Sequence, residues 1–542
     1  MDSDFLHLRN IPDYILTESS HQPSPTKHTS NQGSCNTSDI LNLTTLQLWP
    51  AKAADIIHQK GLSTTKLKNK FNEIIFPWND NYDKQRQLFS SQIQEKPLFI
   101  IFPCEEQEII KIYTLMIKHR LTLRIIGGRH SPLLVEPDIF VVMSKFDYIR
   151  LDKFDHILKV GSYYTQGEVN NFLFQHNPNY HFPGGKINHP NLLTPAFPGG
   201  SASTVSALGI SLSGGIGTLR RTLGLTIDSI ISFKIVVPPT KDSRAEILIA
   251  EKHRHEDLFW ALRGAGNQNF GFITEITYQI DIVSAVILYE INWKYTESTA
   301  RNVLKEWQQN SVYLSNQFNE DLSFFTNNLN EKDSPGKAER GFPEQGINVT
   351  GIYVLKFGQS VKSAQKDVKK NTYYLLKLGG TMLIDELSSY QDVYIKFVQA
   401  RVYHNFSLGK TVFTRKNLSD EILIPRMREA KKVRARSLIG LQLMGGKISD
   451  VSPKGTSFYP RCAKFFIDIF NHWDSVVDQA GSEAWNRETF RIIHDENRPF
   501  SYIGFPVSGL TPINYYGKNL PRLEEIKKKY DPLNLLKYPD SL

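Results

Sequence analysis

Residues 197–230 read FPGGSASTVSALGISLSGGIGTLRRTLGLTIDSI, and small residues dominate positions 199–217. Because glycine has no Cβ atom, its backbone approaches a ligand closely and tolerates dihedral angles that other residues avoid. Successive N–H groups in such turns form a concave anion site. Two shorter runs have the same character, RIIGGRHSPLL at 124–134 and LRGAGNQNFG at 262–271. One phosphate needs only one loop, so three such segments predict a long anionic ligand. For any single glycine, an ordinary turn or tight packing is the alternative.

The segments around these glycines alternate between short strands and amphipathic helices. Residues 96–103 and 121–128 are typical of buried strands, and 104–120 carries apolar residues at helical spacing. A strand, a helix, a strand and a glycine turn begin an α/β arrangement. Residues 229–239 and 272–283 predict two further strong strands.

The pattern changes after about residue 285. Strand-like runs at 285–295, 347–358 and 437–446 are separated by helical patterns such as 298–310 and 363–379. Strands with helices between them predict one sheet that is covered on one side.

The composition narrows the class of protein. The net charge of +9 over 542 residues suits anionic small molecules, and no arginine-rich arm or zinc-finger spacing supports nucleic-acid binding. The three cysteines lack CxxC spacing, which argues against a disulfide framework and a cysteine metal site. No signal peptide is visible and no apolar run approaches the roughly 18 residues of a membrane span. We therefore expect no membrane partner and a cytoplasmic protein, with unconventional secretion left open.

The glycine-rich segments match neither the G-x-G-x-x-G dinucleotide fingerprint nor a Walker A sequence. From about Trp78 to the C-terminus, the chain instead resembles the flavoprotein family of vanillyl-alcohol-oxidase type, in its berberine-bridge-enzyme-like branch. The resemblance rests on the order and spacing of five motifs: RIIGGRHS, the 197–230 segment, DLFWALRGAGNQNFG, GGKISDVSPKGTSFYPR and NYYGKNLPRLEEIKKKYDPLNLLKYPDSL.

The resemblance implies an α+β fold with four parts. A two-part PCMH-type FAD-binding domain would span 78–285, and a substrate domain with an antiparallel sheet covered by helices would span 286–495. The C-terminal segment, 496–542, would return to the FAD domain. Residues 1–70 form an N-terminal extension, in which the polar stretch 18–40 predicts a flexible linker.

The resemblance also implies FAD, held covalently through His130. The loop of Gly127, Gly128 and Arg129 would cradle the pyrophosphate, and a neutral imidazole is a good nucleophile toward the 8α-methyl group of the oxidised flavin. The further FAD-binding residues that the matching motifs imply are Ser131, Gly200, Ser203, Thr204, Val205, Ser206, Gly209, Gly214, Gly217 and Asn519.

Three positions depart from the family pattern or qualify it. Arg129 stands where the family has glycine, and its guanidinium is expected to face solvent or contact phosphate. Ala202 stands where many members carry a second flavin link through cysteine, so a single attachment is expected. A small valine at position 205 leaves room for dioxygen in the family, which favours an oxidase over a dehydrogenase.

The catalytic base is less evident. The family often uses a tyrosine in a Y-x-N-Y strand, but here Gly504 and Phe505 replace the asparagine and the second tyrosine. Tyr502, Gln442 and Tyr459 are the remaining polar candidates, and each also fits a structural hydrogen-bonding role.

Two functions from different classes follow. The first is an FAD-linked oxidoreductase that oxidises an alcohol, a sugar hydroxyl or an amine-bearing small molecule, with dioxygen as the electron acceptor. The second is a catalytically degenerate flavin-binding protein that acts as an interaction module through its N-terminal segment.

Overall fold

The structure is a computed structural model, and it describes residues 37–88, 90, 94–130, 136–176, 192–200, 202–329, 345–395, 406–497, 500–537 and 541–542. The chain divides into two units, Met1–Trp49 and Pro50–Leu542. Helix α1 (Thr37–Gln59) begins inside the predicted linker. The helices that follow it before the large sheets are α2 (Thr64–Lys70) and α3 (Tyr82–Arg86).

The first sheet of the second unit is small and mixed. Its strand order is β1-β2-β4-β3, with β1 antiparallel and the other three parallel. Helix α4 (Glu106–His119) is the predicted amphipathic helix and buries Ile109, Ile112 and Met116. It connects two parallel strands, as the spacing predicted. The strands are β1 (Ile74–Ile75), β2 (Phe99–Ile101), β3 (Leu123–Ile126) and β4 (Ile139–Val142).

A second, antiparallel sheet has the order β5-β6-β10-β8-β9. Its apolar residues share one core with helices α5, α6 and α8. The strands are β5 (Ile149–Asp152), β6 (Ile157–Gly161), β8 (Ile230–Val237), β9 (Glu246–Glu251) and β10 (Phe272–Gln279). The helices of this region are α5 (Gln166–Gln175), α6 (Ala207–Ser213), α7 (Arg220–Leu223) and α8 (Glu256–Ala265), and a two-stranded sheet joins β7 (Thr194–Ala196) to β11 (Asp281–Val283).

The later part of the chain builds a seven-stranded sheet of order β15-β12-β14-β13-β17-β18-β16, in which every neighbouring pair is antiparallel. Its strands are β12 (Val286–Lys294), β13 (Phe318–Asn327), β14 (Gln345–Val354), β15 (Thr381–Ser388), β16 (Phe406–Thr414), β17 (Arg436–Leu443) and β18 (Phe465–Trp473). The short helices beside it are α11 (Tyr390–Tyr394) and α13 (Lys447–Asp450).

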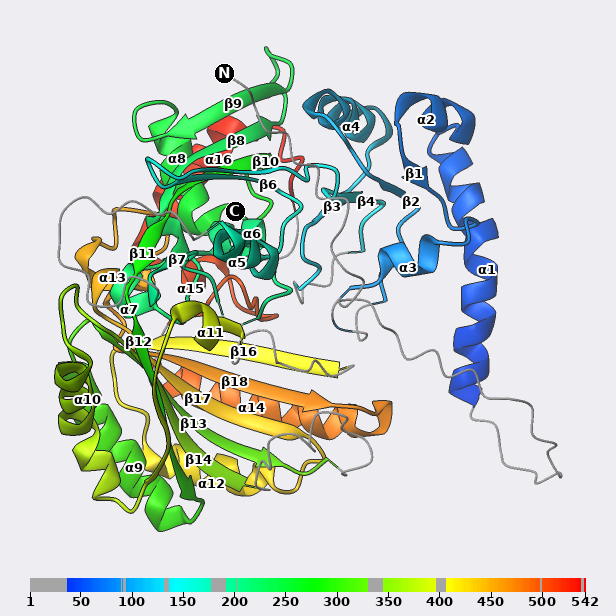
Figure 1. Cartoon of the computed structure of the whole chain (residues 1–542). Coiled ribbons are helices and arrows are strands. Elements are labelled where there is room, and N and C mark those ends of the chain that lie inside the picture. The colour runs from blue at the N-terminus through cyan, green and yellow to red at the C-terminus, as the bar shows by residue number, and fades with distance from the viewer. Residues whose placement is uncertain are drawn as a thin grey trace. The chain divides into compact units, whose positions relative to one another are not determined.

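Helices cover one face of this sheet (Figure 1). Side chains alternate between the faces of a strand. On the covered face, Leu322, Ile439 and Ile467 pack with Trp307 and other helix residues in one apolar core. The predicted sheet with helices on one side is confirmed. The helices are α9 (Glu297–Asn310), α10 (Val361–Leu376), α12 (Asp420–Ala430) and α14 (Gln479–Asn497).

The C-terminal helices α15 (Pro512–Tyr516) and α16 (Leu520–Tyr530) return to the earlier region. Leu523 and Ile526 are buried in the core that holds α5, α6 and α8. The Lys527 ammonium donates to the backbone oxygen of Asn269 over 2.7 Å and to Asp531 over 2.7 Å. The α+β class and the returning C-terminal segment are thereby confirmed.

The domain boundaries stay predictions, although two helices and strand β1 already precede Trp78. Over the described ranges, no helix combines the length and the apolar character needed to cross a bilayer.

Candidate functional site

The loop after β3 meets the start of helix α6. A Cβ atom at Gly128 would overlap the backbone nitrogen of Ser206, and one at Gly127 would lie 3.2 Å from the Ser206 Oγ. Two predicted cofactor-binding segments that are far apart in the sequence thus meet through backbone atoms at Gly128 and Ser206. Only glycine permits this approach.

Arg129 adopts a left-handed backbone conformation with φ of 63°. Its guanidinium donates to the backbone oxygens of Gln85 and Gln87 over 2.6 and 2.7 Å. A left-handed conformation costs an ordinary residue about 1–2 kcal/mol, which explains why glycine suits this position in the resembling motif. Here the two carbonyl contacts offset that cost, and they hold the guanidinium against the backbone of Gln85 and Gln87. The contact of Arg129 with phosphate stays a prediction.

His130 lies partly buried at the end of this loop, and its Nε2 is 2.9 Å from the Thr204 hydroxyl oxygen. Burial lowers the pKa of His130 to about 4. The imidazole is therefore neutral at physiological pH, the form in which a ring nitrogen acts as a nucleophile. Thr204, which the motif at 197–230 placed near the cofactor, thus contacts this ring.

Gly214 and Gly217 of the 199–217 segment are packed tightly within the protein. A Cβ atom at Gly217 would lie 2.7 Å from the Gly199 oxygen, and one at Gly214, with φ of 124°, would lie 2.5 Å from the Phe458 ring. The Gly200 N–H donates to the Gln166 Oε1 over 2.6 Å. Tight internal packing, the alternative explanation for single glycines, therefore accounts for Gly214 and Gly217.

The middle of the same segment is held by backbone hydrogen bonds. The oxygens of Ser203 and Val205 accept from the N–H groups of Gly167 and Gln166, both over 2.9 Å. Ser206 caps α6, and its Oγ accepts from the Gly209 N–H over 3.4 Å. These contacts fix the turn that carries Thr204. Ser131, the remaining predicted residue of the first loop, lies outside the described residues.

Tyr502 connects the glycine-rich segment to the seven-stranded sheet. Its hydroxyl accepts from the Gly215 N–H over 3.1 Å, and its own N–H donates to the Thr411 Oγ1 over 3.3 Å. Its ring contacts Phe413, Phe458 and other aromatic rings. Burial raises the pKa of Tyr502 to about 12. The phenol therefore stays protonated at neutral pH.

Asn519 is buried and holds the turn before β18. Its side-chain nitrogen donates to the backbone oxygens of Pro453, Thr456 and Ser457 over 2.8, 3.2 and 3.3 Å. Its described contacts are thus with the protein, and its role toward the cofactor stays a prediction.

Comparisons with known proteins agree on the family. The family model "Berberine and berberine like" matches residues 501–542, which contain Tyr502 and Asn519. This chain is similar to the berberine-bridge-enzyme-like proteins. The predicted resemblance is thereby confirmed.

Among these relatives, the uncharacterised FAD-linked oxidoreductase YgaK of Bacillus subtilis is 24% identical over 496 residues, covering 89% of this chain and 98% of YgaK. The fold matches Physcomitrella patens BBE-like 1 with a TM-score of 0.71 at 19% identity, over 86% of this chain and 96% of that one. The xylooligosaccharide oxidase from Myceliophthora thermophila, solved with xylobiose, gives 0.70 at 20% identity, over 88% and 98%.

The residues of this chain fit the FAD that the resemblance implies. No acidic residue occurs at 123–130 or at 194–217, so an anionic pyrophosphate would meet no carboxylate from these segments. The backbone at Gly127 and Gly128 carries no side chains, and it directly precedes the neutral ring of His130. Backbone N–H groups in such turns are suitable donors to phosphate.

The two other catalytic candidates differ in their surroundings. Gln442 extends from β17, and its Nε2 donates to the Asp468 Oδ2 on β18 over 2.6 Å. The Tyr459 ring stands edge-on to Phe500, 4.9 Å between centroids, and leaves no room for a side chain at Gly517. Gln442 thus belongs to the face of the sheet opposite the helices α9, α10, α12 and α14, which we call the open face. Tyr459 instead packs against the C-terminal segment.

The open face of the sheet carries polar side chains in rows across the strands, except at Phe413 and Phe466, which are buried in the core that holds α5, α6 and α8. Residues paired directly in an antiparallel sheet point to the same face. Thr411 and Gly440 both pair with Asp468, and Gly440 also pairs with Ser323. The next row holds Phe413, Phe466, Gln442, Asp321, Thr350 and Glu290.

Asp468 is the functional candidate that sequence reasoning missed. It is 7% exposed, which is unusual for a carboxylate. The only signal in the sequence was an aspartate inside the apolar run FFIDIF, and its strand partners could not be read from that run.

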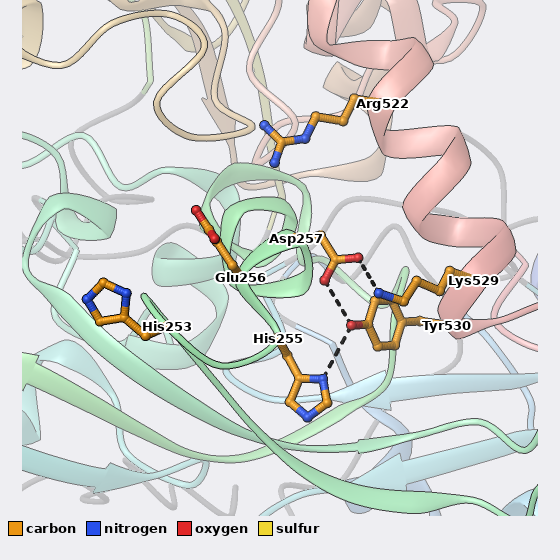
Figure 2. A pocket seen from close by; sticks show the side chains of 7 residues that line it. All are labelled: His253, His255, Glu256, Asp257, Arg522, Lys529 and Tyr530. Carbon is orange, nitrogen blue, oxygen red and sulfur yellow. Dashed lines mark hydrogen bonds and ion pairs between the residues drawn. The ribbon is translucent and has the colours of Figure 1, made fainter.

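A separate surface hollow lies at the start of α8 and the end of α16 (Figure 2). Its centre is Asp257, which accepts from Lys529 over 2.6 Å and from the Tyr530 hydroxyl over 2.9 Å. Burial opposes ionisation, but these hydrogen bonds lower the pKa of Asp257 overall. Arg522 stacks on Trp260 at 4.0 Å. None of these residues belongs to the predicted site, and the described chain holds no group of three or more side chains arranged for a metal.

Proposed function

We propose that this chain is an FAD-dependent oxidase that oxidises an alcohol, a sugar hydroxyl or an amine-bearing small molecule and passes the electrons to dioxygen. The broader class, an FAD-linked oxidoreductase, is that of its relatives. The observation that carries the proposal is the meeting of the Gly128 and Ser206 backbones beside the neutral imidazole of His130. Bound FAD supplies a two-electron acceptor at this place.

The proposal includes one covalent attachment, through His130. The ring contacts the Thr204 hydroxyl, and because its pKa is lowered to about 4 it stays neutral even at pH values well below physiological pH. A neutral imidazole nitrogen is the form that attacks an electrophilic carbon. Ala202 cannot form a thioether, so a second link at that position is excluded by its chemistry.

The open sheet face supports a hydroxyl-bearing substrate over an apolar one. Asp468, Gln442, Ser323 and Thr350 all point to that face. Such side chains donate to and accept from hydroxyl groups. The related xylooligosaccharide oxidase was solved with the sugar xylobiose. Dioxygen as the acceptor rests on Val205, the small residue that the family pattern associates with oxygen access.

The cofactor is tested on the purified full-length chain by its visible spectrum, its intact mass and acid precipitation. We expect yellow protein whose colour stays in the acid pellet. His130→Ala should release the colour to the supernatant, while the matched variant His253→Ala, at an exposed position in the hollow of Figure 2, should not. Colourless protein would contradict flavin binding, and an unchanged adduct in His130→Ala would contradict the attachment.

The activity is tested by anaerobic mixing with glucose, cellobiose, xylobiose, chito-oligosaccharides, simple alcohols and amines. We expect at least one compound to bleach the flavin, and hydrogen peroxide to form when air is admitted. A second candidate function, a flavin-binding interaction module without turnover, is favoured by Gly504 and Phe505 in the Y-x-N-Y motif and by the hydrogen-bonded Tyr502 hydroxyl. Bleaching by dithionite but by none of the compounds would support that alternative.

A further inference from the structure

The first glycine loop contains an arginine where the resembling motif has glycine. Arg129 has φ of 63°, in the left-handed region that disfavours every residue with a side chain. Glycine would adopt this conformation freely, so an arginine there needs a compensating interaction. His130 follows directly in the chain, and the backbone conformation at Arg129 therefore sets the direction in which the imidazole leaves the loop.

The compensating interaction is a contact between the Arg129 guanidinium and the backbone of a second segment. Its Nη1 donates to the backbone oxygens of Gln85 and Gln87 over 2.6 and 2.7 Å, and its Nη2 donates to the Gln85 Oε1 over 3.3 Å. Hydrogen bonds from a charged donor are stronger than those between neutral groups. The contact therefore holds the loop in a conformation that its sequence alone would disfavour.

The segment that Arg129 contacts is itself fixed to strand β3, which leads into the loop. Arg86 lies between the two glutamines, is buried, and donates to the backbone oxygen of Glu95 over 3.3 Å. The Glu95 carboxylate accepts from the buried Arg124 of β3 over 2.6 Å. The strand and the loop that follows it are thus both held by residues 85–87 and Glu95.

We propose that Arg129 is the positioning residue for flavin attachment: by binding residues 85–87 it holds the loop so that the His130 ring meets the 8α-methyl group of the flavin. The inference rests on the proposed function, and it gives a role to the residue that departs from the family motif. Positioning matters to the rate, because a displacement of about 1 Å between reacting groups slows a reaction about 10²-fold. The Thr204 hydroxyl, 2.9 Å from the His130 Nε2, marks the position that the ring holds.

The attachment step balances without another group of the protein. A ring nitrogen of His130 forms a C–N bond to the 8α carbon, while one C–H bond of the methyl group and the N–H bond of the imidazole break. The two electrons and two protons released reduce the flavin ring, and dioxygen then accepts them and becomes hydrogen peroxide.

A direct contact of the guanidinium with the pyrophosphate is the other role that its charge would suit. The two roles differ in what glycine does at position 129. Glycine restores a relaxed left-handed backbone, so it replaces a positioning arginine, but it supplies no charge to a phosphate. Alanine supplies neither the conformational freedom nor the carbonyl contacts.

The test uses full-length apoprotein, made in a riboflavin-depleted host, of wild type, Arg129→Ala, Arg129→Gly and Arg129→Lys. FAD is added, in-gel flavin fluorescence against time gives the rate of covalent incorporation, and thermal unfolding of the apoprotein shows whether each variant is folded. Arg120→Ala is the matched control, because Arg120 also has a left-handed backbone, with φ of 52°, but is exposed at the end of α4.

We expect Arg129→Ala to incorporate FAD about tenfold more slowly than wild type, because it keeps the disfavoured conformation and loses both carbonyl contacts. Arg129→Gly should stay within about threefold of wild type, although it removes more of the side chain. Arg129→Lys should lie between them, since a single ammonium does not reproduce the planar fork of a guanidinium. Arg120→Ala should match wild type.

The affinity for FAD is measured by fluorescence titration in a His130→Ala background, where no attachment occurs. Adding Arg129→Gly to this background should change the dissociation constant of FAD less than about threefold, because the arginine is not proposed to bind phosphate. A rise of about tenfold or more would overturn the inference in favour of a phosphate contact.

Equal slowing of incorporation in folded Arg129→Ala and Arg129→Gly would overturn the inference and leave the proposed function standing. So would a wild-type rate in Arg129→Ala. If Arg129→Ala does not fold, the comparison of Arg129→Gly with wild type decides, and a loss of incorporation in folded Arg129→Gly contradicts the positioning role. Wild-type protein that binds no FAD, or binds it without attachment, would instead overturn the proposed function, and the role of Arg129 with it.

Discussion

The glycine-rich segment at 197–217 and the polar face of the seven-stranded sheet are the two halves of the proposed site, and they are built in opposite ways. In the segment, backbone does the positioning, since Gly128 meets Ser206 and Gly217 meets Gly199 without side chains. On the sheet, side chains from separate strands are combined, as when Gln442 holds Asp468. A site built from backbone can be recognised in the sequence from a local run of glycines. A site built from side chains on paired strands has no such local signal.

The difference also shows what each half tolerates. Added atoms disturb the segment, because its glycines lie against neighbouring backbone. Changes of charge or of hydrogen-bonding group disturb the sheet face and the residues that hydrogen-bond to it. Four substitutions or measurements, given from the largest expected effect to the smallest, test this contrast.

The largest effect is expected at the ion pair that joins the two halves. Arg461, which is fully buried before β18, contacts both carboxylate oxygens of Asp228, just beyond the glycine-rich segment, over 2.6 and 3.0 Å. Asp228→Asn leaves a buried guanidinium without its counter-charge and should lower the free energy of unfolding by about 3–5 kcal/mol. Urea titrations measure this change.

The control for Asp228→Asn is Glu297→Gln, which removes the partner of the exposed Arg428. Exposed pairs are screened by water, so no measurable loss is expected there. Equal losses of unfolding free energy in the two variants would contradict the claim that the buried ion pair stabilises the contact between the two halves.

Next comes Gly215→Ala in the segment. Gly215 has φ of 79°, and a Cβ atom there would overlap the Thr226 side chain. Crowding together with the left-handed conformation should cost about 2–4 kcal/mol. Gly379→Ala has the same φ of 79° but nothing within 4 Å, so only about 1 kcal/mol is expected. If the two variants unfold at the same urea concentration, crowding plays no part in the segment.

A smaller effect is expected for Tyr502→Phe. The buried N–H of Gly215 loses its acceptor, which should cost about 1–3 kcal/mol of unfolding free energy. Flavin reduction by the substrate should stay within a few-fold of wild type, because a phenol whose pKa is raised to about 12 stays protonated at neutral pH. A loss of rate of about 10²-fold or more, the usual contribution of a general base, would assign a catalytic role to Tyr502.

The smallest effect concerns pH and His130. Its pKa of about 4 lies below the usual value near 6.5, so the ring stays neutral as the pH falls from 7.5 to 5.5. Covalent incorporation of FAD into apoprotein should therefore change less than about twofold between these pH values, whereas a pKa near 6.5 predicts about a tenfold drop at pH 5.5. In-gel flavin fluorescence against time measures the rate, and a tenfold drop would contradict a buried neutral ring.

Much of the fold follows from local patterns. The amphipathic helix at 104–120 and the strands at 229–239 and 272–283 appear as α4, β8 and β10. These elements have periodic apolar residues and need no partner to be recognised. The helix that begins at Thr37 was missed, because polar composition alone predicted a linker there.

The site divides in the same way. His130 and the glycines around it were found because their requirements are local, although their roles toward FAD stay predictions. The partners of Arg129 and the pairing of Gln442 with Asp468 were not found, because those contacts join residues 26 or more positions apart. No spacing rule in the sequence reports such contacts.

The amino-acid sequence by itself determined which segments have helical or strand periodicity, where backbone must approach backbone without side chains, and that a histidine ends the first glycine turn. Only the tertiary structure decided that Asp468 faces Gly440 and receives the amide of Gln442. The physical reason is register: a strand fixes the alternation of its own side chains, but a shift of one residue against its neighbour moves every side chain to the other face.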